Sequence, residues 1–270
     1  MAISVNSLWD YGKPEVSEER FRAALDGASE DDKLILQTQI ARTFGLRREF
    51  VKAREVLAAV ERALSQASAE VQVRYFLELG RSYCSPVHPQ ELRTPENVER
   101  ARASFLRAYE LAASARLDFL AVDALHMMPV VDAEPDRQVE WNEKALAYLE
   151  SSDQPEVKGW EGSLRNNVGY AKRLKGDYEA ALRQFQLSRE AHDRAGRARN
   201  VRIADWMIAR TYRDQKRFSE AIAMQLDLER AWDAENEPDP YVFEELEQLY
   251  RELGDDKRAQ HYAQRLKAAR

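Results

Sequence analysis

The sequence has a single cysteine, Cys84, and only 10 glycines and 9 prolines among its 270 residues. One cysteine can neither form an intrachain disulfide nor complete a cysteine-based zinc site, which excludes a disulfide-stabilised secreted scaffold. So few glycines and prolines provide little material for turns. This scarcity disfavours an all-β sandwich and an α/β enzyme with many loops.

Long apolar runs and an excess of positive charge are also missing. No apolar run approaches the roughly 18 residues that a membrane helix needs, and the chain does not open with the basic segment of a signal peptide. We therefore expect a cytoplasmic protein that does not contact membranes. With 47 Asp+Glu against 41 Lys+Arg, the net charge is −6. This balance argues against a general nucleic-acid binder, which needs a basic surface.

Motifs of catalysis and metal binding are absent as well. The four histidines form no His-Glu-x-x-His pattern, and the glycines are isolated rather than gathered in a phosphate-binding loop. The acidic residues are spread along the chain as surface charge, and Cys84 stands in a Tyr-Cys-Ser-Pro stretch at a predicted helix end. We expect no enzymatic activity, no metal site and no cofactor.

What the sequence does contain is a repeat. Gly169 is followed twelve positions later by Ala181, and four positions further on by Phe185. The same twelve-residue spacing joins Ala41 to Ala53, Ala209 to Ala221 and Glu247 to Ala259. A short polar hinge separates the two marker positions, which predicts a helix, a tight turn and a second, antiparallel helix. Small residues at the markers would let the two helices approach closely.

Two further copies have a longer gap of 21 residues between their markers. Their marker pairs are Gly80 with Ala101 and Ala124 with Ala145. The interrupting prolines are Pro86, Pro89 and Pro95 in the first copy and Pro129 and Pro135 in the second. Prolines keep such a connection non-helical, and either Thr94 or Asn97 would cap the returning helix of the first copy.

This pattern resembles the tetratricopeptide repeat, whose period is about 34 residues, in a longer variety like that of kinesin light chains and bacterial regulators. The resemblance implies an all-α fold, a right-handed α-solenoid of about six antiparallel helix hairpins over residues 33–270. The expected repeats are 33–70, 71–115, 116–152, 158–197, 200–236 and 239–270. Residues 1–32 lie before the repeats.

The N-terminal segment is expected to cover the first repeat. Ser17 is a predicted N-cap, and Phe21, Ala24 and Leu25 form an apolar stripe, which predicts a capping helix over 17–27. Trp9 precedes it with a second aromatic residue. Two interpretations stay open for these rings, packing on that end of the solenoid or anchoring a partner.

By the same resemblance, the first helix of each hairpin lines a concave groove. The predicted partner-binding residues in that groove are Arg42, Arg81, Asn166, Asn167, Tyr170, Arg173, Trp206, Arg210 and Arg213. Arginine offers a fork of donors suited to carboxylates, and asparagine can bind a peptide backbone as donor and acceptor. Tyr170 and Met207 depart from the pattern of the chaperone-binding carboxylate clamp, so we do not expect that clamp.

Charge is distributed unevenly along the second half. Residues 161–217 carry 14 Lys+Arg and 7 Asp+Glu, whereas residues 218–253 carry 2 and 11. A basic groove would steer an acidic peptide, although the same charges could equally pair between repeats or form a solvated face.

We therefore expect a scaffold or regulator that binds a protein or peptide, with an acidic or C-terminal segment as its ligand. One alternative is a self-associating module that forms a homodimer through the last helix, where Ala259, Tyr262, Ala263 and Leu266 form an apolar face. Another is a ligand-gated regulator, in which Trp206 beside Arg210 forms an aromatic–cation wall for a small molecule or signalling peptide.

Overall fold

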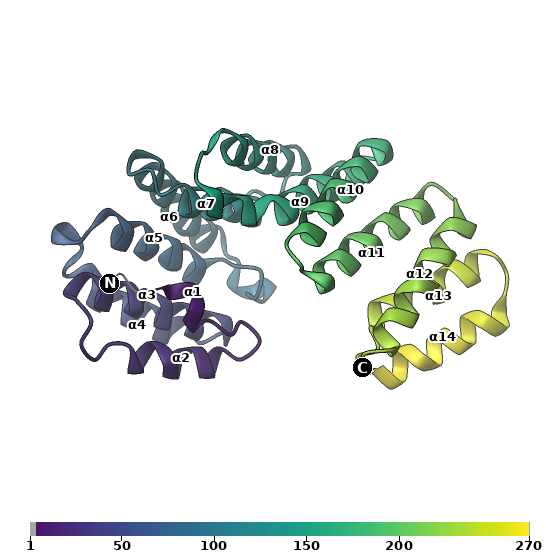
Figure 1. Ribbon diagram of the computed structural model, residues 1–270, viewed down its shortest axis with the longest axis horizontal. Helices are drawn as coiled ribbons and strands as arrows, with labels where there is room; N and C mark the ends of the chain where they lie inside the picture. The colour runs from purple at the N-terminus through teal and green to yellow at the C-terminus, as the bar shows by residue number, and fades with distance from the viewer. Residues whose placement is uncertain (1–3, 270) are drawn as a thin grey trace. The chain divides into compact units, whose positions relative to one another are not determined.

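A computed structural model describes residues 4–269, and its regular structure consists of helices (Figure 1). The chain divides into two compact units, unit 1 (Met1–Lys158) and unit 2 (Gly159–Arg270), which we describe separately. Within residues 4–269, no helix combines the length and the apolar character needed to cross a membrane.

Unit 1 contains a short N-terminal pair of helices followed by three long hairpins. The N-terminal pair is α1 (Val5–Leu8) and α2 (Pro14–Ala23). The hairpins are α3 (Glu30–Leu46) with α4 (Phe50–Glu61), α5 (Ala69–Tyr83) with α6 (Pro95–Ser114), and α7 (Asp118–Val131) with α8 (Pro135–Ser151). Single turns of 3-10 helix lie at Leu64–Gln66 and Gln90–Leu92. Contacts between α3 and α5 and between α5 and α7 stack the hairpins on one another.

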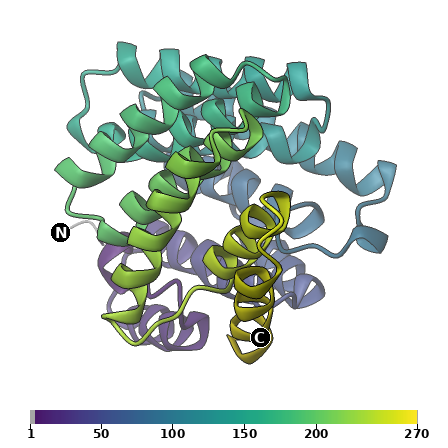
Figure 2. The same ribbon diagram turned by 90° about the vertical axis from the view of Figure 1, so that its right-hand side faces the viewer.

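Unit 2 repeats this arrangement, after a 3-10 segment at Pro155–Trp160. Its hairpins are α9 (Glu161–Leu174) with α10 (Tyr178–Arg194), α11 (Ala198–Asp214) with α12 (Phe218–Asp233), and α13 (Pro240–Glu252) with α14 (Asp256–Ala269). The first helices again contact one another, α9 with α11 and α11 with α13. In Figure 2, which is turned by 90° from the first view, α13 and α14 lie side by side at the C-terminal end of the colour range. The predicted class, an all-α helical-repeat solenoid of six hairpins, is confirmed.

The four predicted hinges share one geometry. Each contains a residue with left-handed backbone dihedrals: Arg48 (φ 64°), Gly176 (φ 80°), Lys216 (φ 60°) and Gly254 (φ 71°). The next amide donates back to the carbonyl five residues earlier, as Glu49 N does to Phe44 O at 2.9 Å and Asp255 N to Tyr250 O at 2.9 Å. This bond satisfies a carbonyl that the helix end leaves without a partner and turns the chain back on itself.

The repeat signature is explained by close packing inside each hairpin. A Cβ placed on Gly80 would come within 2.5 Å of the ring of Phe105, and one on Gly169 within 2.7 Å of the ring of Phe185. Both rings are fully buried. In these two copies the first marker is therefore a glycine because the aromatic residue four positions after the second marker occupies the space above it.

Two local predictions are wrong. Ser17 is not an N-cap, because α2 begins at Pro14 and ends at Ala23 rather than spanning 17–27. A proline at the first helical position loses no hydrogen bond, so it starts the helix earlier. Ser17 is instead buried inside α2, where its hydroxyl donates to Asp10 O at 3.0 Å. Phe21 of the expected stripe is fully buried.

Pro129 does not interrupt the third hairpin, because α7 continues through it to Val131. Pro129 lies in the last turn and removes only the hydrogen bond that its own amide would donate to the carbonyl four residues earlier, and Pro135 then starts α8. In the Gly80 copy, Thr94 is the residue that caps, and its hydroxyl accepts from Asn97 N at 3.2 Å.

The apolar face predicted on the last helix is covered in part by its own hairpin. Ala259 and Tyr262 are buried in a cluster with Phe243, Leu246 and other residues of the same unit. The Tyr262 hydroxyl donates to Glu229 at 2.9 Å. The hairpin therefore covers this part of its own last helix.

Candidate functional site

The nine predicted binding residues lie on four first helices and fall into two groups, one in each unit. Arg42 and Arg81 lie on α3 and α5 in unit 1. The seven others lie on α9 and α11 in unit 2. Each group of arginines meets carboxylates from neighbouring first helices.

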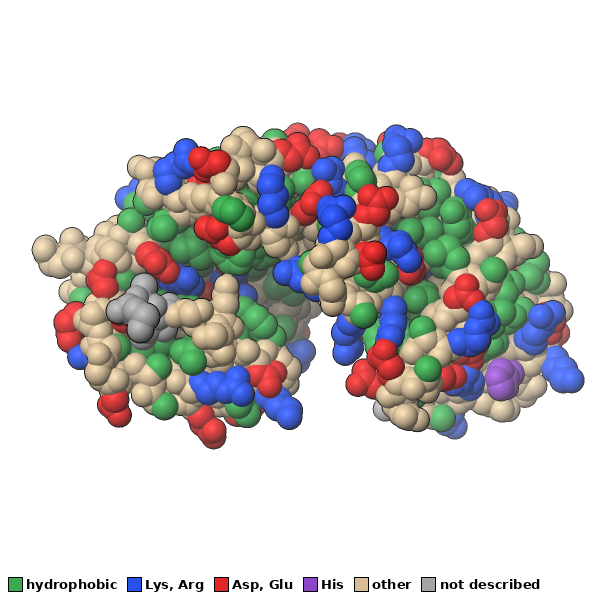
Figure 3. All heavy atoms as spheres, in the orientation of Figure 1, with side chains coloured by type: hydrophobic (Ala, Val, Ile, Leu, Met, Phe, Trp, Pro, Cys, Tyr) green, Lys and Arg blue, Asp and Glu red, His purple; other side chains and the backbone are tan. Residues whose placement is uncertain are grey.

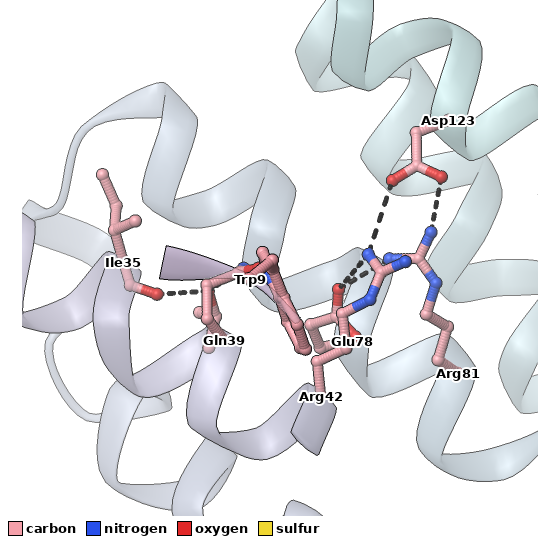
Figure 4. Close-up of polar contacts among 8 residues, drawn as sticks. Trp9, Ile35, Gln39, Arg42, Glu78, Arg81 and Asp123 are labelled. Carbon is pink, nitrogen blue, oxygen red and sulfur yellow. Dashed lines mark hydrogen bonds and ion pairs between the residues drawn. The ribbon is translucent and has the colours of Figure 1, made fainter. Parts of the chain in front are cut away.

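In unit 1 the two arginines join Glu78 and Asp123 in what we call the unit 1 ion cluster (Figure 4). Arg81 donates to Glu78 Oε1 at 2.6 Å and also to Asp123. Arg42 lies 3.4 Å from the same Glu78 oxygen and 4.0 Å from Asp123 Oδ2. Two guanidinium groups therefore balance two buried carboxylates.

The pKa values of this cluster reflect that balance. Burial disfavours charge on Asp123, but Arg81 and Arg42 outweigh it and hold the pKa of this carboxyl below its ordinary value. Burial likewise opposes the charge on Arg81, and the two carboxylates outweigh it and raise the Arg81 pKa. The charges in the unit 1 ion cluster thus stabilise one another and bind three first helices together.

The N-terminal segment covers Arg42. The rings of Trp9 and Tyr11 stack 4.6 Å apart, and the Arg42 guanidinium carbon lies 5.7 Å and 5.6 Å from their centroids. Trp9 Nε1 donates to Gln39 Oε1 at 3.1 Å, as the close-up of these residues shows (Figure 4). The aromatic pair therefore packs on the first-helix surface of α3, and Arg42 is engaged from both sides.

In unit 2 three arginines meet only two carboxylates, and we call these five residues the unit 2 ion cluster. Arg173 Nη2 lies 2.6 Å from Asp214 Oδ2. Arg210 Nε lies 2.9 Å from Glu245 Oε1, and Arg213 Nε lies 3.3 Å from Glu245 Oε2. Arg213 also lies 4.0 Å from Asp214. One positive charge of the cluster is therefore not balanced within it.

Burial dominates the electrostatics of the unit 2 ion cluster. Glu245 is 3% exposed, and burial raises its pKa although the three arginines oppose this effect. Burial also lowers the pKa of Arg210. The side chains of Arg210 and Arg213 are still 27% and 16% exposed. These charges are thus less well compensated than those of the unit 1 ion cluster.

The remaining predicted residues flank this cluster. Asn166, Tyr170 and Arg173 follow one another at helical spacing on α9, so they share one face. Tyr170 is 41% exposed, and Asn166 and Asn167 are half-buried. On α11 the Arg210 guanidinium carbon lies 4.6 Å from the centre of the Trp206 ring, so the predicted aromatic–cation pair forms.

Sequence reasoning missed the acidic half of both clusters. Glu78 and Glu245 occupy the same repeat position, two residues before the first marker, and that shared position was the available signal. Asp123, by contrast, stands one residue before its marker. The uneven charge along the sequence is also partly used for pairing, because Arg202 pairs with Glu235 of the acidic stretch. Over unit 2, Figure 3 shows basic and acidic side chains interleaved rather than one basic field.

The single cysteine and His88 are both buried. Burial raises the thiol pKa of Cys84. The ring of His88 stacks on Phe50 with 3.6 Å between centroids, and its pKa is lowered by burial. Among residues 4–269 no group of His, Cys, Asp and Glu side chains has the arrangement of a metal site.

Comparison with solved structures identifies the fold. A signal transduction ATPase with a tetratricopeptide repeat sensor, from Pyrococcus horikoshii, matches 95% of this chain with a TM-score of 0.70 at 13% identity. The chain has the tetratricopeptide-repeat fold. It spans 39% of the length of that ATPase. The apo form of RapI matches 98% of this chain with a TM-score of 0.71 at 12% identity, and the match covers 73% of the RapI chain.

Sequence comparisons add no closer relative. No protein-family model matches the chain, and no curated protein matches it. The tetratricopeptide-repeat fold is therefore visible in the packing of the helices and in the spacing of their markers, while sequence identity to these solved structures is only 12–13%.

Proposed function

We propose that this chain is a non-catalytic binding scaffold of the cytoplasm that recognises an acidic peptide segment through the unit 2 ion cluster. The observation that carries this proposal is the unbalanced positive charge of Arg173, Arg210 and Arg213 against Asp214 and Glu245. The similar fold of a protein described as a tetratricopeptide repeat sensor supports a binding role. The scaffold is the repeat region predicted over residues 33–270.

A carboxylate of the ligand would supply the missing negative charge. Arginine presents its donors in a planar fork, which matches the two oxygens of an Asp or Glu side chain or of a C-terminus. Arg210 and Arg213 are the partly exposed members, so they would contact the ligand. Asn166 and Asn167 on the preceding first helix would bind the peptide backbone, since an amide side chain both donates and accepts.

Unit 1 has a different role in this proposal. Its arginines face an equal number of carboxylates, and Trp9 and Tyr11 cover Arg42. A buried and balanced cluster of this kind contributes to the register of the helices rather than to ligand binding.

One substitution tests the charge argument with little structural damage. Arg213→Gln removes the unbalanced charge and leaves each carboxylate a partner, since Arg173 still faces Asp214 and Arg210 still faces Glu245. Arg230→Gln is the matched control because it removes the same charge from α12, where Arg230 is 71% exposed and pairs with Asp227. The probe is a fluorescent alanine peptide with a central Glu–Glu pair, compared with the same peptide carrying Gln–Gln.

We expect the Glu–Glu peptide to bind more tightly than the Gln–Gln peptide. Hydrogen bonds to charged groups contribute about 1.5–3 kcal/mol, so Arg213→Gln should weaken binding of the Glu–Glu peptide by roughly 10- to 100-fold. Arg230→Gln should leave it within about twofold. Equal binding of the two peptides, or an equal loss in the two variants, would contradict the proposal.

A further inference from the structure

An aromatic pocket opens beside the unit 2 ion cluster. It has a volume of about 270 Å³ and lies between α11, the end of α12 and the start of α13. Its lining residues are Arg199, Arg202, Ile203, Trp206, Trp232, Asp239 and Tyr241. Three aromatic rings and an isoleucine therefore form most of its walls.

Those walls are held in place by contacts within unit 2. Trp206 Nε1 donates to the Tyr241 carbonyl at 3.4 Å, and the two rings meet edge to face with centroids 6.1 Å apart. Trp232 is 5% exposed, and the guanidinium carbon of Arg202 lies over its ring, 4.4 Å from the ring centre. A rigid aromatic wall loses little conformational entropy when a ligand binds.

Two of the polar groups that line the pocket, those of Arg202 and Asp239, are already engaged. Both terminal nitrogens of Arg202 donate to Glu235, and the Asp239 carboxylate accepts from Tyr241 N at 2.9 Å as it caps α13. What the pocket presents to solvent is therefore mainly apolar. Ile203 is 44% exposed and Tyr241 61% exposed, so both side chains offer apolar surface to a ligand that enters the pocket.

Trp206 connects this pocket to the ion cluster. Its ring lines the pocket and also lies beneath Arg210. A peptide that places a carboxylate on the arginines would therefore have its neighbouring residues beside the pocket, since an extended chain advances about 3.3 Å per residue.

We infer that the pocket receives an aromatic side chain of the same peptide, close in sequence to its acidic residue. This inference rests on the proposed function of the ion cluster. Two arginines against one aspartate line the pocket, which disfavours a basic side chain, and an aliphatic one could not form the edge-to-face contacts that three aromatic walls offer. The ligand would thus be a short motif that combines an acidic and an aromatic residue.

A phenylalanine scan of the Glu–Glu alanine peptide tests this inference. Phe replaces each alanine in turn, and affinity is measured by fluorescence polarisation against the unsubstituted peptide. We expect Phe at one or two positions near the acidic pair to improve affinity about tenfold, the effect of a buried aromatic anchor. Leu at the same positions should improve it less.

Two variants assign that gain to the pocket. Tyr241→Ser removes an exposed wall but keeps the carbonyl that accepts from Trp206, and Ile203→Ser removes a second wall. Both should reduce the advantage of Phe over Ala to less than about twofold. Leu253→Ser is the matched control, because Leu253 is an apolar residue that is 52% exposed and lies outside the pocket. It should retain the full advantage.

The outcomes separate the two proposals. If the Glu–Glu peptide binds and Arg213→Gln weakens it, but Phe improves affinity at no position, the pocket inference is overturned and the proposed function stands. An advantage of Phe that survives both pocket variants overturns it as well. If the Glu–Glu peptide binds no better than the Gln–Gln peptide, the proposed function fails and the pocket inference fails with it.

Discussion

The contact between Gly80 and Phe105 allows a quantitative test of why this copy of the repeat has a glycine at its first marker. Alanine at this position would place a Cβ 2.5 Å from the Phe105 ring, a distance shorter than Cβ atoms show in real structures. The ring is fully buried and cannot move into solvent. Gly80→Ala must therefore displace packed side chains or helices, and overpacking of this kind typically costs about 1–3 kcal/mol.

Gly45 provides the matched control. It lies near the end of α3, where a Cβ would meet nothing within 4 Å. Gly45→Ala should stabilise the protein by about 0.5–1 kcal/mol, because alanine loses less conformational entropy than glycine when a helix forms. Gly80→Ala gains the same entropic stabilisation but also pays the cost of overpacking against Phe105. It should therefore be less stable than Gly45→Ala by about 1–3 kcal/mol.

A double-mutant cycle assigns this cost to the ring. Phe105→Leu replaces the ring atoms that Gly80 faces, so the effect of Gly80→Ala should become neutral or favourable in that background. Free energies of unfolding come from urea titrations followed by circular dichroism. The reasoning is refuted if Gly80→Ala is as stable as Gly45→Ala, or if its cost is unchanged beside Phe105→Leu.

Three further predictions concern the carboxylates and the N-terminal segment. The lowered pKa of Asp123 contributes stability that is present above its unfolded pKa of about 3.9 and lost as the pH falls through the folded value. In Asp123→Asn, the free energy of unfolding measured with urea should therefore fall less steeply with decreasing pH than in the wild type. The same pH dependence in both proteins would contradict this. Glu245 has the opposite sign, because burial raises its pKa and its ionisation costs stability as the pH rises from about 4.3 through the folded value. Glu245→Gln should remove that decline, which the same titrations would detect. Trp9→Ala should destabilise unit 1 by about 2–3 kcal/mol, less than for a fully buried tryptophan, because it removes the contacts with Gln39 and Phe21. If the variant unfolds thermally at the same midpoint temperature as the wild type, these contacts do not stabilise the unit.

Much of the fold could be predicted because the repeat encodes local packing. Spacing between a small residue and an aromatic residue reports a contact inside one hairpin, such as that of Gly169 with Phe185, and this contact does not depend on distant parts of the chain. Helix ends were predicted less well. Ser17 resembles an N-cap, but Pro14 starts the helix earlier, and Pro129 lies in the last turn of α7, where it removes a single hydrogen bond.

The candidate site could be predicted only in part, because charge in a repeat protein serves two purposes. The arginines of the first helices were recognisable from their positions, but a position alone does not show whether a guanidinium faces a ligand or a carboxylate of the next repeat. Arg81 meets two carboxylates, whereas Arg213 shares its carboxylates with two other arginines. This difference depends on side chains brought together by stacking. The same holds for the pocket of Trp206, Trp232 and Tyr241, whose walls come from three helices.

Nuclear magnetic resonance of the arginine Nε–H groups tests the central claim most directly. Titration with the Glu–Glu peptide should shift the signals of Arg210 and Arg213, and titration with the Gln–Gln peptide should not. The signal of Arg230, which pairs with Asp227 on the exposed surface of α12, should stay in place in both titrations. A Glu–Glu peptide that leaves Arg210 and Arg213 unmoved, or shifts Arg230 equally, would contradict an acidic ligand at the unit 2 ion cluster.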